Sequence, residues 1–239
     1  MISLVFLVPT RFDSWLAGYL AHHLRKHPLF DLCVASGITH NLLGGIWYAA
    51  ALFILWVQGR QPGEEATRRR ILTTFAGSLI AAALTVIAGG VISWPAPAHS
   101  PGLAAMYMYY MGQNPSVNSF PSQSTALYAS VTAGVYSLHK STGWLLWSAI
   151  LLLVALPRMY VGGHYFTDIV AGLALGLAGY AGARYLLENT LIDRIDLVFG
   201  SKTKLQVFAE LVVFAWILQV ALEFRDVVWA RNSLKYLLG

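Results

Sequence analysis

Apolar residues in this chain fall into long runs separated by short polar segments. A bilayer core about 30 Å thick requires about 20 apolar residues in a helix. Six stretches meet or approach that length, and we expect a transmembrane helix in each: 36–57, 71–92, 126–139, 143–160, 166–187 and 207–224. The stretch 126–139 is short, and Glu210 and Glu223 interrupt the last stretch, which could instead lie along the membrane surface. The pattern predicts an all-α, polytopic membrane helix bundle with about six (five to six) transmembrane helices.

The first part of the chain has a different pattern. Residues 12–27 place Trp15, Tyr19 and three leucines at helical spacing, with a basic cluster at one end. This arrangement is typical of a helix that lies in the membrane interface. We therefore expect three regions, an N-terminal interfacial helix, a transmembrane core and a C-terminal membrane-associated extension, over residues 1–30, 31–187 and 188–239.

Composition and charge support a membrane protein. The chain is 57% hydrophobic and only 11% charged, and no charged residue occurs between Arg70 and Lys140. Surface helices of a soluble protein would carry charges over such a length. The net charge of +5 does not indicate nucleic acid binding, because the cations flank the apolar stretches. The single cysteine, Cys33, excludes a disulfide or a cysteine-rich metal site within the chain.

The positions of the cations predict the orientation. The loop that carries Arg60 and Arg68–Arg70 is expected on the cytoplasmic side, because inner loops are rich in Lys and Arg. Lys140 and the basic residues of 184–204 then also lie inside. The proline-rich loop 93–124 and the turn that follows Arg158 lie outside.

Two polar stretches therefore meet at the outer face, SFPSQST (119–125) and RMYVGGHYFTD (158–168). His164 and Asp168 are four residues apart at a helix start, so the carboxylate can reach one imidazole nitrogen and leave the other free to attack. The planar fork of Arg158 suits two phosphate oxygens. Ser122, with its neighbours Gln123 and Ser124, opens a helix, where free N–H groups favour an anion. Together these residues predict a phosphate site that faces a histidine nucleophile.

Each of these residues also has an ordinary explanation. Arg158 could be an interfacial anchor, His164 and Asp168 a structural pair, and the PSQST segment a helix N-cap. The combination favours a functional site, because ionisable side chains at membrane depth are costly.

The segment P-R-M-Y-V-G-G-H-Y-F-T-D resembles the third motif, S-R-x5-H-x3-D, of the type 2 phosphatidic acid phosphatase superfamily, particularly its bacterial undecaprenyl pyrophosphate phosphatases. Pro157 replaces the first Ser of the motif, and the resemblance covers roughly residues 12–187. It implies that His164 forms a phosphohistidine, that Asp168 orients it, and that Arg158 clamps phosphate. It also implies that no metal or other cofactor takes part, and that the site faces the periplasm from the inner membrane.

The other two motifs of this superfamily are degenerate here. The second motif, F-P-S-(G/D)-H, reads Phe120 to Ser124, so that Ser124 stands where the general-acid histidine is expected. The first motif, K-x6-R-P, lacks both cations. His99 lies near that motif, either as a possible surrogate for them or as an ordinary interfacial histidine.

These departures bear on the reaction. A serine hydroxyl cannot supply a proton as an imidazolium can, and loss of a general acid costs about 10²- to 10⁴-fold in rate. A phosphate that leaves from a diphosphate needs the proton less than an alkoxide does. We therefore expect a phosphoric-ester or phosphoanhydride hydrolase or phosphotransferase that acts on polyprenyl diphosphate or a related lipid phosphate. The alternative is a catalytically impaired family member that binds lipid phosphate, assists transport, or acts as a structural subunit whose C-terminal region contacts a partner or a second copy.

Overall fold

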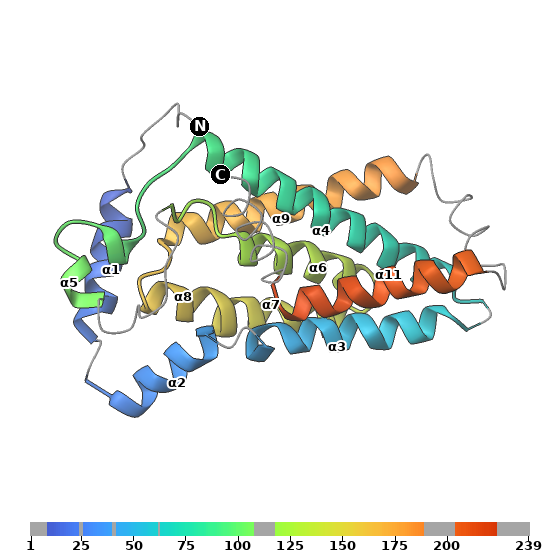
Figure 1. Cartoon of the computed structure of the whole chain (residues 1–239), viewed down its shortest axis with the longest axis horizontal. Helices are drawn as coiled ribbons and strands as arrows, with labels where there is room; N and C mark the ends of the chain where they lie inside the picture. The colour runs from blue at the N-terminus through green and yellow to red at the C-terminus, as the bar shows by residue number, and fades with distance from the viewer. Residues whose placement is uncertain are drawn as a thin grey trace, which may run out of the picture.

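The chain folds into an elongated bundle of helices (Figure 1). The computed structural model describes residues 9–23, 26–39, 42–61, 63–107, 118–188 and 204–223 of the 239 residues. The helices are α1 (Arg11–His23), α2 (Pro28–Thr39), α3 (Leu42–Gly59), α4 (Glu65–Val91), η1 (Pro97–His99), α5 (Ala104–Tyr107), α6 (Gln123–Leu138), α7 (Lys140–Ala149), η2 (Ile150–Ala155), α8 (Leu156–Tyr160), α9 (Phe166–Glu188) and α11 (Lys204–Ala221). The predicted all-helical architecture is confirmed over these residues.

Among the described residues, three helical stretches are long and apolar enough to cross a membrane, namely Glu65–Val91, Lys140–Tyr160 and Phe166–Leu187. Gly44–Gly59 and Gln206–Ala221 are shorter apolar helices. All five coincide broadly with predicted stretches. The prediction of one continuous helix over 36–57 is wrong, because α2 ends at Thr39 and α3 begins at Leu42. The polar residues Thr39 to Asn41 interrupt the apolar run at this point.

The long helix Lys140–Tyr160 is not uniform. It begins as α7, passes through the π-helical turn η2 and continues as α8. Pro157 lies at the start of α8, and a proline has no N–H to continue the α-helical hydrogen-bond ladder. The π-helical turn therefore adjoins a position where the α-helical hydrogen-bond ladder is interrupted.

The centre of the bundle is α6, which is short and mostly buried between α4 and α9. Glycines in α9 allow this helix to approach α6 closely. A Cβ atom at Gly172 would lie 2.5 Å from the carbonyl oxygen of Ser122, and one at Gly176 would lie 2.3 Å from that of Ala126. Small residues let the backbones of membrane helices pack directly against each other. This packing places the start of α6 against the start of α9.

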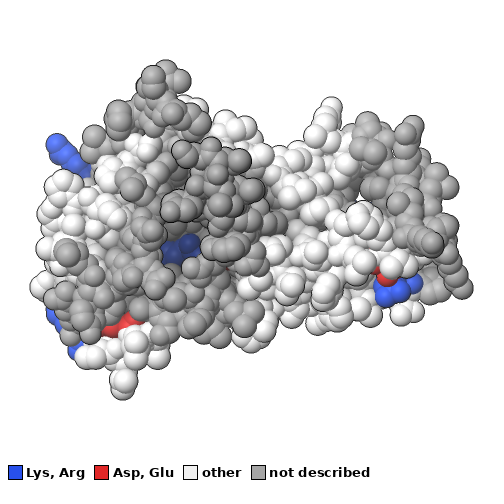
Figure 2. Space-filling model, in the orientation of Figure 1, with Lys and Arg blue, Asp and Glu red and all other residues white. Residues whose placement is uncertain are grey.

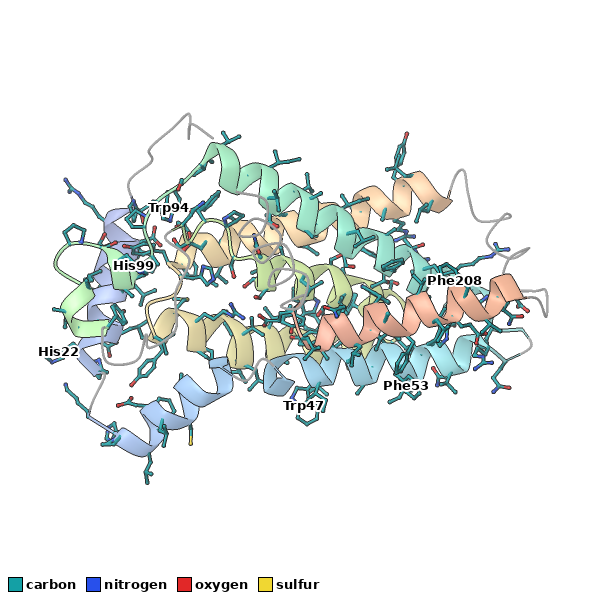
Figure 3. The ribbon with its side chains drawn as sticks, viewed as in Figure 1. His22, Trp47, Phe53, Trp94, His99 and Phe208 are labelled. Carbon is teal, nitrogen blue, oxygen red and sulfur yellow. The ribbon has the colours of Figure 1, made fainter. Side chains whose placement is uncertain are left out.

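The sides of the bundle carry large apolar side chains that point outward. Trp47 and Phe53 on α3, and Phe208 on α11, are exposed and are labelled in Figure 3. On the face drawn in Figure 2, charged side chains are few and most of the described surface is uncharged. Such a surface is unfavourable in water and suits the lipid tails of a bilayer. These are the features of a membrane protein.

Helix α1 lies across one end of the bundle (Figure 1). Trp15 and Tyr19 are exposed on it, whereas Leu16 and Leu20 pack against a buried cluster that includes Met159. An exposed aromatic face beside a packed face is consistent with the predicted interfacial helix.

Helix α11 runs beside α3 (Figure 1) and belongs to the bundle. Val213, Trp216 and Val220 lie in the main core, together with residues of α3, α4 and α6. The Trp216 indole N–H donates to the Ser78 hydroxyl over 3.0 Å. The C-terminal region therefore shares the core of the preceding helices.

Three of the cations that predict the inner side lie together. Arg70, Lys140 and Arg184 line one cavity of about 630 Å³ with aromatic side chains from α6 and α7. The start of α4, the α6–α7 turn and the later part of α9 are therefore at the same end of the bundle.

Candidate active site

The two polar stretches singled out from the sequence lie together in the fold. The backbone N–H of Ser122, at the start of α6, donates to the carbonyl of Asp168 near the start of α9, over 3.1 Å. The imidazole of His164 contacts the carbonyl of Ser119. The close packing of α6 on α9 thus brings residues 119–124 to residues 164–168.

His164 occupies the connection between α8 and α9, with its side chain 14% exposed. Its Nδ1 atom lies 2.9 Å from the Ser119 carbonyl oxygen. Because a carbonyl only accepts, Nδ1 must carry the hydrogen. In the neutral ring the lone pair then lies on Nε2, which is the state required of a nucleophile.

The connection is tight because Gly162 adopts a positive φ of 76°. A Cβ atom at this position would approach the Tyr107 ring to 2.7 Å. Tyr107 itself is fully buried, and its hydroxyl donates to the carbonyl of Ala17 over 2.6 Å.

Asp168 is completely buried at the third residue of α9. Its carboxylate accepts hydrogen bonds from the Trp94 indole N–H at 2.9 Å and from the Tyr165 backbone N–H at 2.7 Å. The second bond caps the helix, because an acidic residue at this position can accept from the N-cap amide. The expected hydrogen bond between the His164 imidazole and the Asp168 carboxylate is absent, since Nδ1 lies 3.6 Å from the nearer oxygen. The carboxylate is nevertheless close to the ring.

Trp94 and Tyr165 complete the surroundings of Asp168. The Tyr165 hydroxyl shares a 2.7 Å hydrogen bond with Ser100. Burial raises the pKa of Tyr165, and the charge of Asp168 adds to this, although the bond to Ser100 acts in the opposite direction. The phenol is therefore neutral at physiological pH. Sequence reasoning missed Trp94, which is 74 positions from Asp168 and matches no motif.

Arg158 and Ser124 meet at a carboxylate that sequence reasoning also missed. The same oxygen of Glu223, Oε2, accepts from the Arg158 guanidinium and from the Ser124 hydroxyl, the latter over 2.8 Å. The side chains of Arg158 and Glu223 are 18% and 8% exposed. Glu223 follows the end of α11 and has a positive φ of 53°. From the sequence, Glu223 is recognisable only as an interruption of an apolar stretch.

The remaining candidates lie at different depths. Ser122 is buried, and its hydroxyl shares a 2.9 Å hydrogen bond with Thr125. Gln123 is exposed at the start of α6. His99 is exposed at the end of η1, and no hydrogen bond joins its ring to the described residues of the site. Figure 3 labels His99 and Trp94 at the same end of the bundle.

Within the residues that the structure describes, no group of three or more His, Cys, Asp or Glu side chains is arranged to hold a metal ion. The polar atoms gathered at this end are instead a histidine with a free lone pair, two carboxylates, a guanidinium and hydroxyls. This set suits transfer of a phosphoryl group through a histidine, with a guanidinium that already holds one anionic group, the carboxylate of Glu223.

Comparison with known proteins gives a consistent result. Residues 70–191 match the PAP2 superfamily. The chain is 33% identical over 148 residues to decaprenylphosphoryl-5-phosphoribose phosphatase of Mycobacterium tuberculosis, covering 61% of this chain and 74% of that protein. It is 28% identical over 129 residues to the bacitracin transport permease protein BcrC of Bacillus licheniformis, covering 54% of this chain and 59% of that relative, which is less than two thirds of its length. No solved structure matches the chain significantly.

Proposed function

Because this chain belongs to the PAP2 superfamily, we propose that it is a membrane lipid phosphatase or phosphotransferase that uses His164 as its nucleophile. The substrate class we propose is a polyprenyl diphosphate or a related lipid phosphate. The observation that carries the proposal is the hydrogen bond of His164 Nδ1 to the Ser119 carbonyl, which leaves Nε2 with its lone pair. The name of the mycobacterial relative, a phosphatase of a polyprenyl-phosphoryl compound, supports the substrate class.

The proposed reaction has two steps. Nε2 of His164 attacks phosphorus, and the bond from phosphorus to the leaving oxygen breaks as the N–P bond forms. Positive charge then develops on the imidazole, where the buried carboxylate of Asp168 at 3.6 Å stabilises it. In the second step the oxygen of water, or of an acceptor hydroxyl, attacks phosphorus. The N–P bond breaks, its electron pair returns to Nε2, and the proton of the attacking hydroxyl passes to bulk water, so that the neutral imidazole is regenerated.

Arg158 is the proposed clamp for the phosphoryl oxygens, and Ser122, Gln123 and Ser124 at the start of α6 are proposed to contact the same group. Ser124 cannot act as the general acid of the first step, because its hydroxyl does not release a proton near neutral pH. A diphosphate substrate reduces this handicap, since its leaving phosphate is already a stable anion. His99 is exposed, and no hydrogen bond joins its ring to the described residues of the site, which favours an ordinary interfacial histidine over a surrogate for the missing cations.

We propose that the chain crosses an inner membrane about six times, with residues 31–187 as the catalytic core and 188–239 as an extension that completes the bundle. The site then faces the periplasm, opposite the end where Arg70, Lys140 and Arg184 line a common cavity. Helix α6 has 16 residues and spans roughly 24 Å, which is short for a bilayer crossing. Its burial among longer helices makes this length tolerable, because α4 and α9 cover it.

One observation favours a second candidate, a lipid-phosphate binding or transport-assisting protein without turnover. Ser124 stands where the second motif of the superfamily has its general-acid histidine. The carboxylate of Glu223 is hydrogen-bonded to Arg158, the proposed phosphate clamp. The exposed apolar flank of α11 also offers a surface to a partner subunit or a second copy.

The deciding experiment measures phosphate release by the detergent-purified protein from undecaprenyl diphosphate and from a lipid monophosphate. We expect His164→Ala to lower release by at least about 10³-fold, because the proposed covalent intermediate forms on this side chain. His139→Ala, at the exposed α6–α7 turn, is the matched control and should keep full activity. Release that persists in His164→Ala contradicts the proposed nucleophile. Lipid binding by the wild-type protein without any release would favour the second candidate.

A further inference from the structure

The end of α11 is firmly seated against the bundle. A Cβ atom at Gly45 would lie 2.2 Å from the carbonyl oxygen of Ala221, so only a glycine permits this approach of α11 to α3. One residue earlier, the carbonyl of Val220 accepts from the buried Tyr128 hydroxyl over 3.2 Å. The position of Glu223, two residues beyond the helix, is therefore set by packing on two other helices.

The Glu223 carboxylate makes the contacts that a phosphoryl oxygen would make. One oxygen accepts from both Arg158 and Ser124, and the side chain is almost completely buried. A guanidinium binds carboxylate and phosphate with the same geometry. Glu223 lies beyond residues 70–191, the part of the chain that matches the family. The extension thus supplies an anion to the proposed phosphate clamp.

A guanidinium at the membrane surface is surrounded by competing anions. Ordinary phospholipids are phosphodiesters, and each carries one negative charge on its phosphate at neutral pH. Glu223 also carries one negative charge, but it is tethered, so its effective concentration at Arg158 is on the order of millimolar or higher without any need to diffuse. A phosphodiester that displaced Glu223 would bring the same single negative charge to Arg158, so the exchange would give no electrostatic gain. A terminal phosphate or a diphosphate carries more charge and more acceptor oxygens, and can displace it.

From this arrangement we propose that Glu223 is a specificity-determining residue, which keeps phosphodiester lipids off Arg158 and admits terminal phosphates and diphosphates. The inference rests on the proposed function, because it takes Arg158 as the phosphate clamp.

The backbone at Glu223 allows the exchange. Its positive φ of 53° is unfavourable for a residue with a side chain, and the contacts of the carboxylate with Arg158 and Ser124 offset that cost. When a phosphate takes over these contacts, the turn formed by Leu222 and Glu223 can relax while α11 stays in place. Selection then requires movement of one side chain and its turn only.

The test uses binding, so that it does not depend on turnover. The full chain in detergent is titrated calorimetrically with methylenediphosphonate, a stable diphosphate analogue, and with dimethyl phosphate, a soluble diester. We expect the wild-type protein to bind the diphosphonate only. Glu223→Gln should bind the diphosphonate on the order of tenfold more tightly and also bind the diester, because a charge-assisted competitor has been removed. Glu223→Asp, whose shorter side chain cannot reach both partners equally well, should relax selectivity in the same direction.

Glu210→Gln is the matched control, the same substitution at a glutamate within α11, the helix that Glu223 follows. Glu210 pairs with Arg60 at 3.6 Å and lies about 20 Å from Glu223 along the helix axis. Glu223 variants that fold and bind both probes as the wild type does would overturn the selectivity while leaving the phosphate site intact. A loss of phosphate release in Glu223→Gln without any change in binding would also overturn it and assign Glu223 to the chemistry. Failure of every form, wild type included, to bind the diphosphonate would overturn both this inference and the proposed function.

Discussion

The pairing of Trp94 with Asp168 illustrates how the site depends on single hydrogen bonds. Asp168 has no contact with solvent, and each of its oxygens has one donor, the Trp94 indole or the Tyr165 amide. A buried carboxylate that loses a donor is destabilised in its charged form. In the proposed reaction Asp168 acts on His164 through that charge, which would make Trp94 a positioning residue.

Trp94→Phe tests this role. The substitution keeps a ring that can pack on Phe120, whose centroid is 4.6 Å from that of Trp94, but removes the indole N–H. We expect phosphate release to fall roughly tenfold or more, in line with about 1.5 to 3 kcal/mol for a hydrogen bond to a charged group. The pH dependence of the rate should also change, which a purely structural effect would not cause. Trp144→Phe removes an indole from an exposed position and should leave the rate and its pH profile unchanged.

The residues of the site divide into those that can be recognised from sequence and those that cannot. Arg158, His164 and Asp168 fall within one short segment, so their spacing alone indicates shared chemistry. Trp94 and Glu223 join them only through tertiary packing of α4 and α11. The hydrogen-bond partner of His164 was also mispredicted, because helical spacing indicates that Asp168 is near but not that the backbone of Ser119 is nearer.

At the level of helices, α1 is held to α9 by one buried acid. Asp13 accepts from the amide and hydroxyl of Thr167, each at 3.0 Å, and also from Thr10. It is 1% exposed although it lies in a helix with an exposed aromatic face. The amphipathic pattern predicted the helix correctly but not this connection, because periodicity describes faces and not the partners of a polar side chain. Hydrophobic periodicity also did not predict the separation of α2 from α3, because it describes helix faces and not the point at which a helix ends.

Asp13→Asn should loosen this connection. The side-chain amide of the new Asn would direct N–H groups toward the Thr167 and Thr10 donors, which need an acceptor. The free energy of unfolding should therefore fall by about 1 to 3 kcal/mol. We expect a lower thermal unfolding midpoint in detergent and easier proteolysis between α1 and α2. Glu64→Gln provides the comparison, since Glu64 also accepts from a threonine near a helix start but is exposed. Equal midpoints for the two variants would mean that α1 contributes little to the stability of the bundle.

Three cations of the described residues gather at one end of the bundle. Arg70, Lys140 and Arg184 come from three separate parts of the chain and line one cavity, which is consistent with the predicted alternation of inner and outer loops. The number of crossings is harder to predict, because a buried helix such as α6 need not span the full hydrocarbon core when longer neighbours surround it.

Cysteine labelling tests the proposed orientation. In a Cys33→Ser background, His99→Cys should react with a membrane-impermeant maleimide in cells whose outer membrane has been permeabilised, because His99 is exposed at the end that carries the site. Lys140→Cys should react only after the inner membrane is opened. The reverse labelling pattern would place the site in the cytoplasm and contradict the proposed orientation.

The π-helical turn η2 has a consequence for the way a charged residue is carried within an apolar helix. A wider turn accommodates about one extra residue, and one residue corresponds to about 100° of rotation around the helix axis. The turn therefore rotates the side chains of α8 about the helix axis relative to those of α7. Helix α7 exposes Trp144 and Leu145, whereas α8 directs Arg158 toward Glu223. With a regular helix in its place, the same sequence would turn the guanidinium toward lipid. An arginine clamp and an apolar exterior can thus share one continuous segment.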